Sequence, residues 1–344
     1  MIERPSTDAP LGRLSRRVVL RALAAGAVGA AVVGCQAIAP PHSGGTLTNA
    51  SVALDWYPWS DDTGLYLAQD DGNYAAQGLD VKIYVPSNPT DGLKLVASGH
   101  DTFTISYETD VLIAREQGIP VKSIAAIVQH PLNTIMALKS SGIATPKQLE
   151  GKKVGTPGLP SDDAYLETMM RYDGGDPSKA NKVTVNYDLV QALITKQVDA
   201  IVGGYWCHEA ILCEQKGFPV NVMRVEQWGV PDYYELVLVA SDNLIQNSTD
   251  LIRRFLRATV QGYGAAMSNH SKALAALYKA SPETDMQMET KGIELLAPEW
   301  VDKSGRFGIQ DPARWETYAK WMQSQGLLKG TVKPTDAYVT GLVP

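Results

Sequence analysis

The sequence predicts an α/β protein of two lobes with a ligand cleft between them. From Ser51 onward, short apolar strand segments alternate with amphipathic helical segments, a pattern typical of sheets covered by helices. The 344-residue chain opens with an export-like segment before Cys35. About 310 residues remain, which suit two cores of roughly 150 residues better than one. A composition of 44% hydrophobic and 20% charged residues excludes a disordered or fibrous protein.

The N-terminus carries two targeting signals. The segment Ser15–Arg21 places Arg16 and Arg17 before an apolar run of twelve residues, as twin-arginine export signals do. This run is too short to span a bilayer permanently. It ends in Val32-Val33-Gly34-Cys35, which resembles the box of bacterial lipoproteins, whose cysteine is lipidated before cleavage. The alternative is a short membrane anchor that stays uncleaved. Val19 stands where twin-arginine signals often carry Phe, so export by the general secretory route remains open.

We therefore predict an export signal over residues 1–34, then a lipidated Cys35 with a flexible tether over residues 35–46. The tether is rich in Pro and Gly, as flexible linkers are. The body is expected on the outer face of the cytoplasmic membrane, attached to it through the lipid.

The first lobe is predicted to begin with a parallel sheet covered by helices. Its expected strands are Val52–Leu54, Asp80–Val85, Thr102–Ser106, Ser123–Val128 and Ile135–Leu138. Its expected helices are Thr63–Asp70, Asp91–Ser98 and Thr109–Gln117.

A second set of alternating elements follows the polar stretch Lys139–Gly151. Its strands are expected at Lys153–Gly155, Lys182–Tyr187, Ala200–Gly203 and Val220–Val225, with helices at Asp162–Tyr172, Leu189–Thr195 and Glu209–Lys216. The strand Leu236–Ala240 then leads into the helices Ser248–Met267, Ser271–Ala280, Asp285–Leu295 and Asp311–Gln325. We predict lobe one over residues 47–139 and 238–344, and lobe two over residues 140–237.

Charge and cysteine content narrow the function classes. The net charge of −6 falls further without the export segment, which holds five Arg and two acids. A chain this acidic, without a Lys/Arg block, is not expected to bind nucleic acid. Cys207 and Cys213 lie about 9 Å apart along one predicted helix, too far for a disulfide, so both are expected to be free and mostly buried.

Acidic and aromatic side chains gather in the loops that follow the strands. The loops over residues 56–64, 106–110, 155–163 and 203–209 contain Trp, Tyr, Asp and Glu, and none contains Arg or Lys. Ligands of such sheets bind beyond the carboxyl ends of the strands. Acids in the first turn of the following helices repel anions there. The loops therefore favour a flat ligand that carries amino or ring N–H donors. Arg224, at a strand end, is the one exception that could point inward.

The candidate ligand-binding residues follow from these loops and from the segment before Leu236. They are Asp55, Trp56, Trp59, Asp62, Tyr107, Glu108, Tyr205, Trp206, Glu209, Tyr234 and Glu235. The alternative for acids such as Asp61, Asp110 and Asp162 is that they cap helices. Trp206 could equally belong to the core of lobe two, and core packing is the better interpretation for Trp228, Trp300, Trp315 and Trp321.

Several segments in a fixed order resemble the solute-binding proteins of ABC importers in the alkanesulfonate, nitrate and thiamine-precursor group. These segments are Leu54–Pro58, Tyr66–Ala68, Gln77–Val81 and Pro146–Gly155. Two more, Trp206–Ile211 and Pro231–Leu236, are similar to the branch that binds thiamine pyrimidine precursors. The resemblance covers about residues 51–322 and implies a type II periplasmic-binding fold that closes on its ligand.

The function implied by this resemblance is that of an extracytoplasmic receptor, not an enzyme. The ligand would be a small aromatic amine, namely a hydroxymethyl- or formylaminomethyl-aminopyrimidine, and the partner an ABC permease with a cytoplasmic ATPase. We expect a monomer without a metal or cofactor. A receptor of the same fold for another flat heterocycle, such as a flavin, or for a small sulfonate is the first alternative.

A pyrimidine-making enzyme is the second alternative, because the fungal pyrimidine synthase belongs to the same superfamily. That enzyme uses a Lys and a His four residues apart and a cysteine-rich motif. At the corresponding places this chain has Tyr107 and Val111, and its segment Asp232–Val239 lacks cysteine. Without the Lys amine and the His, this chain lacks the side chains that react in that synthesis.

Overall fold

The computed structural model describes residues 46–88, 91–186 and 188–344. The predicted export signal, Cys35 and nearly all of the tether lie outside these residues. The strands are β1 (Thr48–Ala53), β2 (Leu79–Tyr84), β3 (Phe103–Ser106), β4 (Val121–Val128), β5 (Asn133–Leu138), β6 (Lys153–Thr156), β7 (Asn181–Thr184), β8 (Ala200–Tyr205), β9 (Val220–Arg224) and β10 (Leu236–Ser241).

The helices fall largely where the sequence predicts them. They are α1 (Thr63–Asp70), α2 (Asn73–Ala76), α3 (Gly92–Ala97), α4 (Glu108–Glu116), α5 (Pro160–Tyr172), α6 (Leu189–Ile194), α7 (Glu209–Gln215), α8 (Asp242–Asn247), α9 (Thr249–Ser268), α10 (His270–Ala280), α11 (Met286–Leu296) and α12 (Pro312–Ser324). Short 3-10 helices are η1 (Ser60–Asp62), η3 (Lys139–Ser141), η4 (Pro146–Leu149), η5 (Pro177–Lys179), η6 (Val225–Trp228), η7 (Ala297–Trp300) and η8 (Pro334–Asp336). The short helices α2 and α8 and the 3-10 helices were not predicted.

The strands form two five-stranded sheets, with the orders β2-β1-β3-β10-β4 and β7-β6-β8-β5-β9. Both sheets are mixed, whereas the alternation of strands and helices predicted a parallel sheet in the first lobe. In the first sheet β10 runs antiparallel to β3 and β4, and in the second sheet β5 runs antiparallel to β8 and β9. Each antiparallel strand directly follows a segment that crosses from one sheet to the other: β5 is the first strand of the second sheet along the chain, and β10 returns the chain to the first sheet.

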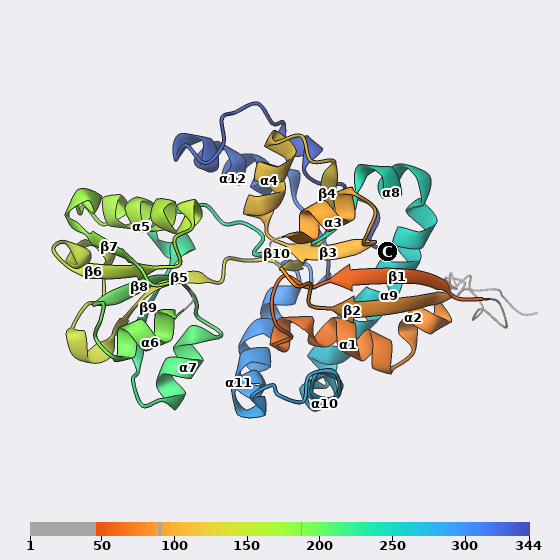
Figure 1. Ribbon diagram of the computed structural model, residues 1–344, viewed down its shortest axis with the longest axis horizontal. Helices are drawn as coiled ribbons and strands as arrows, with labels where there is room; N and C mark the ends of the chain where they lie inside the picture. Colours follow the sequence, from red (N-terminus) through yellow and green to blue (C-terminus); the bar gives the residue numbers. More distant parts are fainter. Residues whose placement is uncertain (1–45, 89–90, 187) are drawn as a thin grey trace, which may run out of the picture. The chain divides into compact units, whose positions relative to one another are not determined.

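The position of β5 also differs from the predicted division into lobes. Residues 133–138 were assigned to lobe one, but β5 pairs with β8 and β9 of the second sheet. β10 begins at Leu236 and belongs to the first sheet. We therefore propose that lobe two starts near residue 130 and ends near residue 234. In Figure 1, α5 covers one side of the second sheet, and α6 and α7 cover the other.

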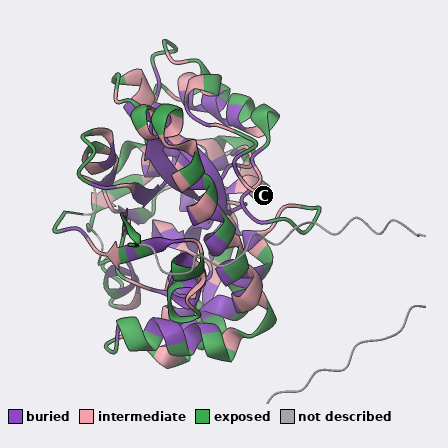
Figure 2. Cartoon of the chain, turned by 90° about the vertical axis from the view of Figure 1, so that its right-hand side faces the viewer, coloured by how far each residue is buried: buried purple, intermediate pink, exposed green. Residues whose placement is uncertain are grey.

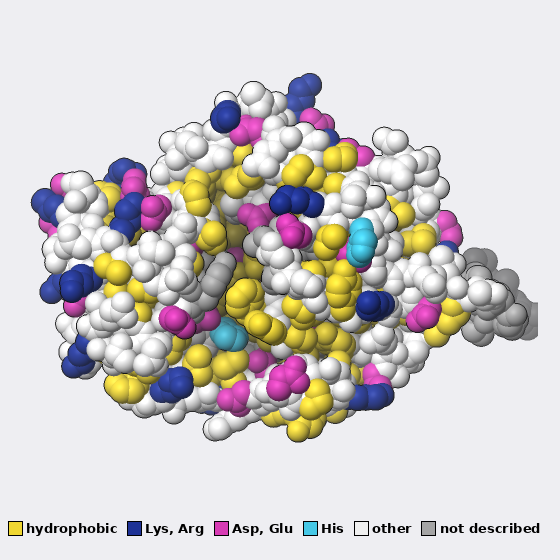
Figure 3. Space-filling view, viewed as in Figure 1, with side chains coloured by type: hydrophobic (Ala, Val, Ile, Leu, Met, Phe, Trp, Pro, Cys, Tyr) yellow, Lys and Arg dark blue, Asp and Glu magenta, His cyan; other side chains and the backbone are white. Residues whose placement is uncertain are grey.

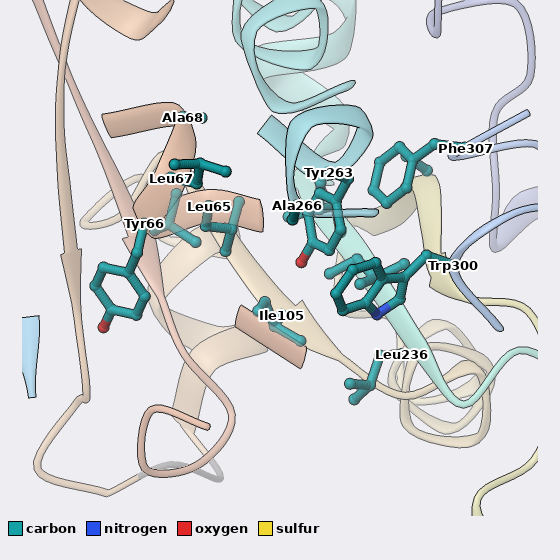
Figure 4. Close-up of a cluster of buried hydrophobic side chains, with 14 of the residues drawn as sticks. Leu65, Tyr66, Leu67, Ala68, Ile105, Leu236, Tyr263, Ala266, Trp300 and Phe307 are labelled. Atoms are coloured by element: carbon teal, nitrogen blue, oxygen red, sulfur yellow. The ribbon is translucent and has the colours of Figure 1, made fainter. Parts of the chain in front are cut away.

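The largest core lies in lobe one, between the first sheet and the helices α1, α9 and α10. Tyr263 of α9 packs against Phe307 with the ring centroids 4.3 Å apart and meets the edge of Trp300 at 5.1 Å. Figure 4 shows these rings beside Leu65, Ile105 and Leu236, which come from a helix and two strands far apart in the sequence. In Figure 2 buried residues concentrate on the strands and on the inner sides of the helices.

Other sequence predictions about the core hold in the structure. Trp300, Trp315 and Trp321 are buried, as core packing predicts, while Trp228 is only half-buried. Cys207 and Cys213 are free and buried, which confirms the prediction. Within the described part of the chain, we find no helix of sufficient length and hydrophobicity to cross a membrane.

A close helix crossing in this core provides the first testable prediction. A Cβ atom at Gly262 of α9 would lie 2.1 Å from the carbonyl oxygen of Gly64 in α1. Gly262→Ala is therefore expected to push α9 away from α1 and to lower the free energy of unfolding by about 1–3 kcal/mol. Gly264→Ala is the matched control, since a Cβ there meets nothing within 4 Å and a helical Gly→Ala change stabilises by up to about 1 kcal/mol. Equal effects of the two substitutions in urea unfolding would contradict this packing.

Candidate ligand-binding site

The candidate site is assembled from loops at the carboxyl ends of three strands and from one crossing segment. Residues 54–62 follow β1, Tyr107 follows β3, and residues 205–209 are the last residue of β8 and the segment after it. The crossing segment before β10 adds residues 233–235. Open α/β sheets bind their ligands at this edge, so the sequence pattern brings these side chains to a common region.

Two tyrosine–carboxylate pairs form the inner part of the site. The hydroxyl of Tyr107 donates a hydrogen bond of 2.6 Å to Asp55, and the hydroxyl of Tyr205 donates one of 2.8 Å to Glu235. Burial raises the pKa of Asp55, and the hydrogen bond from Tyr107 opposes that rise. The Asp55 and Glu235 carboxylates lie near enough to Tyr205 to contribute to its raised pKa, after burial. The structure therefore brings four predicted residues together.

Glu235 links the two crossing segments to the second sheet. Its carboxylate is buried and accepts hydrogen bonds from the Leu132 amide (2.8 Å), the Asn133 side chain (3.0 Å), and the Tyr233 and Tyr205 hydroxyls. Burial raises the pKa of Glu235, and these donors counteract it. Because the donors come from both crossings and from β8, Glu235 fixes the segments where the chain passes between the sheets.

Trp59 and Glu209 bring the start of α7 close to the loop after β1. The Trp59 ring lies 6.1 Å from the ring of Tyr205 and meets His208 edge-on at 5.4 Å. Glu209 accepts a 2.7 Å hydrogen bond from the Tyr205 amide and lies 2.9 Å from Nδ1 of His208. The second sheet therefore contacts the loop after β1 through an aromatic edge formed by Tyr205 and His208.

Of the two acids after Trp59, Asp62 takes part in capping a helix, because its carboxylate accepts from the Trp59 amide in a capping box at η1. Asp61 and Asp62 are buried, and neither carboxylate oxygen of Asp61 has a hydrogen-bond partner among the described residues. The Asp62 carboxylate lies 3.4 Å from the amide of Trp59. Burial, together with repulsion from neighbouring carboxylates, raises the pKa of both acids well above its ordinary value. Asp162 lies in the first turn of α5, where burial raises its pKa to about 8 although a hydrogen bond with the Leu159 backbone opposes the rise.

Three predicted residues take other roles. Tyr234 is buried in the core, where its ring stacks under the Arg314 guanidinium at 4.5 Å and its hydroxyl accepts from the Asp311 amide. Glu108 is fully buried and accepts from the Tyr234 amide at 2.7 Å. The Trp206 indole donates to the carbonyl of Pro131 at 3.2 Å. These side chains hold the crossings in place.

Tyr233 was not among the predicted site residues, although a signal for it is present in the sequence. Tyr233 and Glu235 are two residues apart in an extended segment, so their side chains point to the same side, and their hydrogen bond is 3.0 Å. Glu289 of α11 was also missed; its carboxylate accepts a 2.6 Å hydrogen bond from the Ser60 amide, 229 residues away. No local sequence pattern predicts such a contact.

A pocket of about 260 Å³ opens beside this cluster. Its lining comprises residues 56–59, His208, Ser281, residues 283–285, Met288 and Glu289. Trp56 is exposed at its rim, whereas Trp59 is buried in its wall. Figure 3 shows a hollow near the middle of one face, with hydrophobic side chains on its walls and acidic side chains around it.

Positive charge is kept away from this pocket. None of the described residues that line it is Lys or Arg. Arg224, which the sequence left open, lies over the ring of Trp206 at 4.4 Å and pairs with Glu226 at 2.6 Å. Among the described residues no group of His, Cys, Asp and Glu is arranged to hold a metal ion.

The fold defines the class of protein. The chain aligns with the alkanesulfonate-binding protein SsuA from Xanthomonas axonopodis pv. citri at a TM-score of 0.65 and 13% identity, over 87% of this chain and all of the other. The aliphatic sulphonate binding protein SsuA of Escherichia coli gives a TM-score of 0.65 and 14% identity, over 85% of this chain and 94% of that one. These alignments confirm the predicted periplasmic-binding fold of type II.

The chain belongs to the NMT1/THI5-like family, whose model matches residues 59–273. A formylaminopyrimidine-binding protein of Halalkalibacterium halodurans is 34% identical over 85% of this chain and 90% of its own length. The riboflavin-binding protein RibY of Chloroflexus aurantiacus is 24% identical over 88% of both chains. A 4-amino-5-hydroxymethyl-2-methylpyrimidine phosphate synthase of Saccharomyces cerevisiae is 24% identical over 69% of this chain and 73% of its length.

The burial of Glu108 beside the Tyr234 backbone predicts a pH-dependent stability. Burial raises the pKa of Glu108 to about 8 from an ordinary value of 4.5. The folded chain then holds a proton that the unfolded chain releases, so this contribution is complete below about pH 4.5 and is lost as the pH rises through about 8. Glu108→Gln still accepts from the Tyr234 amide but cannot ionise. It is expected to raise the free energy of unfolding by about 1–2 kcal/mol at pH 8.5 and hardly at pH 5. Urea unfolding at both pH values measures the difference in the free energy of unfolding between Glu108→Gln and the wild type. Equal differences at the two pH values would contradict this prediction.

Proposed function

We propose that this chain is the extracytoplasmic substrate-binding protein of an ABC importer and captures a thiamine pyrimidine precursor. The observation that carries the proposal is the 34% identity to a formylaminopyrimidine-binding protein, over 90% of that relative's length. Similarity over nearly the whole length relates the complete two-lobed body, and not an isolated motif, to a binding protein for this class of ligand.

The proposed ligand site consists of the pocket and the inner cluster beside it. Trp56 and Trp59 supply aromatic surfaces, which suit stacking with a heteroaromatic ring. Asp55, Glu235 and Glu209 supply carboxylate acceptors, which suit exocyclic amino and ring N–H donors. A ligand bound there would hold the two lobes together, because the loop with Trp59 follows a strand of the first sheet and residues 205–209 lie at the end of a strand of the second.

Pocket size and charge favour a pyrimidine over the other ligand classes. A cavity of about 150 Å³ accommodates benzene, so about 260 Å³ suits one substituted six-membered ring. Drug-sized ligands occupy roughly 300–1,000 Å³, which disfavours a flavin. The carboxylates and the lack of Lys or Arg in the described lining disfavour a sulfonate.

A binding protein is also favoured over a pyrimidine synthase. Tyr107 donates to Asp55 and Val111 is buried inside α4, so the described residues at these positions offer neither an amine nor an imidazole. The synthase relative is 24% identical, against 34% for the binding protein.

The remaining parts of the proposal concern location and partners. We propose a lipid anchor at Cys35, export through the twin-arginine signal around Arg16 and Arg17, and a monomeric receptor on the outer face of the cytoplasmic membrane. It would deliver its ligand to a permease with a cytoplasmic ATPase. Globomycin treatment of expressing cells would leave the precursor uncleaved if Cys35 is lipidated, and Cys35→Ala would remove the mature lipidated form.

A thermal-shift panel tests the ligand class. The full-length protein in detergent would be heated with formylaminomethyl-aminopyrimidine, riboflavin or taurine. A ligand at 100 times its Kd adds about 2.7 kcal/mol of stability, so the pyrimidine is expected to raise Tm by several degrees. A shift with riboflavin or taurine in place of the pyrimidine would overturn the proposed ligand and leave the binding fold intact.

A further inference from the structure

The pocket beside the inner cluster has aromatic walls, and most of its ionisable lining residues are acidic. Trp56 and Tyr57 meet edge to face with ring centroids 5.5 Å apart, and Trp59, which also lines the pocket, meets the His208 ring edge-on at 5.4 Å. Indole and phenol rings attract cations through their faces. Walls of this kind are therefore suited to a positively charged group as well as to a flat ring.

Three carboxylates from one segment line the pocket. The segment before and within α11 contributes Glu283, Asp285 and Glu289 to the lining. Each carboxylate accepts at least one hydrogen bond. Glu283 accepts from the hydroxyl of Ser281 (2.8 Å), Asp285 from the amide of Gln287 (3.0 Å), and Glu289 from the amide of Ser60 (2.6 Å). Fixed carboxylates stabilise a cation without having to be reoriented.

The titratable groups in and beside the pocket give it a net negative charge. The hydrogen bonds of Glu283 lower the pKa of its carboxyl, and burial raises that of Glu289. His208 is the one lining residue, among those described, that can become positive. Burial opposes its protonation, but its contact with Glu209 and the nearby charge of Glu289 prevail and raise its pKa. Even with His208 protonated, three carboxylates of the pocket and Glu209 outweigh one positive charge.

We propose that this pocket selects a ligand with a protonated primary amine, so that the preferred pyrimidine carries an aminomethyl substituent in place of a hydroxymethyl or formylaminomethyl one. The proposal rests on the proposed function and specifies which member of the ligand class binds best. The ring would lie between Trp56 and Trp59, with its ammonium group directed at Glu289 and the rim carboxylates Glu283 and Asp285.

The test compares two pyrimidines that differ little except in charge. Calorimetric titration of the full-length protein in detergent at pH 7 and low salt would use 4-amino-5-aminomethyl-2-methylpyrimidine and its hydroxymethyl counterpart, with the formylated amine as a third ligand. The amine is expected to bind at least tenfold more tightly than the alcohol. Its advantage is expected to shrink at 0.5 M salt, because Glu283 and Asp285 are exposed.

Two variants separate the charge effect from a loss of folding. Glu289→Gln keeps an acceptor for the Ser60 amide, and Glu283→Gln changes an exposed rim residue. Both are expected to weaken binding of the amine at least fivefold and to leave binding of the alcohol within twofold. Glu167→Gln on the surface of α5, outside the pocket lining, is the matched control and should change neither.

The possible outcomes are distinct. Equal or tighter binding of the alcohol or the formylated amine would overturn the inference while supporting the proposed function. Unchanged amine binding by both variants would also overturn it. If none of the three pyrimidines binds, the proposed function fails, and the inference fails with it.

Discussion

Replacing Trp59 with alanine is expected to weaken binding of the pyrimidine about a hundredfold, or about 2.7 kcal/mol. Trp59 is buried to 7% exposure and lines the pocket while contacting Tyr205 and His208. Its removal takes away a stacking surface for the ligand, and it also removes the ring against which the second sheet rests. Stacking contributes about 0.5–1.5 kcal/mol, and the apolar area lost to water accounts for the remainder.

Two further variants show whether the loss belongs to the pocket. Trp59→Phe keeps an aromatic wall and is expected to lose about tenfold. Tyr172→Ala removes an exposed ring, far along the chain from the pocket lining, that contacts Trp228, and should leave the affinity unchanged. Calorimetric titration measures the affinities, and a melting curve for each variant establishes that it is folded. Wild-type affinity in a folded Trp59→Ala protein would exclude the pocket as the ligand site.

Replacing Glu235 with alanine is expected to lower the free energy of unfolding by about 3–4 kcal/mol. The substitution removes the common acceptor of the Leu132 amide, the Asn133 side chain and the hydroxyls of Tyr205 and Tyr233. Each buried donor left without a partner costs about 1–3 kcal/mol, and entry of water into the space reduces the total. Urea unfolding provides the measurement.

Smaller changes at the same place should have graded effects. Glu235→Gln keeps one acceptor oxygen and is expected to cost about half as much. Tyr233→Phe deletes a single donor and is expected to cost about 1 kcal/mol. A loss below 1 kcal/mol for Glu235→Ala would mean that this carboxylate does not hold the crossing segments together.

The arrangement of strands shows how far local pattern determines the fold. The helix predicted at Thr63–Asp70 is α1, residue for residue, because its apolar periodicity and preceding acids are local signals. The sheet to which β5 belongs was predicted incorrectly. A buried apolar strand such as Asn133–Leu138 has the same composition whether it lies in the first or the second sheet and whether it runs parallel or antiparallel, since those properties depend on its neighbours.

The candidate site was likewise predicted in part: some of its contacts follow from local pattern, and others depend on packing between distant segments. Loops after β1, β3 and β8 were predicted to share one region because the edge of a parallel sheet brings strand ends together, and the pairs Asp55–Tyr107 and Tyr205–Glu235 follow. Tyr234 was chosen over Tyr233, although alternation along an extended chain places Tyr233 beside Glu235. Glu289 reaches Ser60 only through packing of α11 against η1, which no spacing in the sequence encodes.

The central claim is that the chain captures a pyrimidine precursor in an aromatic and acidic pocket. A calorimetric titration of the full-length protein in detergent with hydroxymethyl-aminopyrimidine, its formylated aminomethyl analogue and taurine tests it most directly. We expect both pyrimidines to bind with one-to-one stoichiometry, with binding lost in Trp56→Ala, and no heat with taurine. Binding of taurine alone would contradict the claim, because the acidic and aromatic pocket would then prefer a small sulfonate to a pyrimidine.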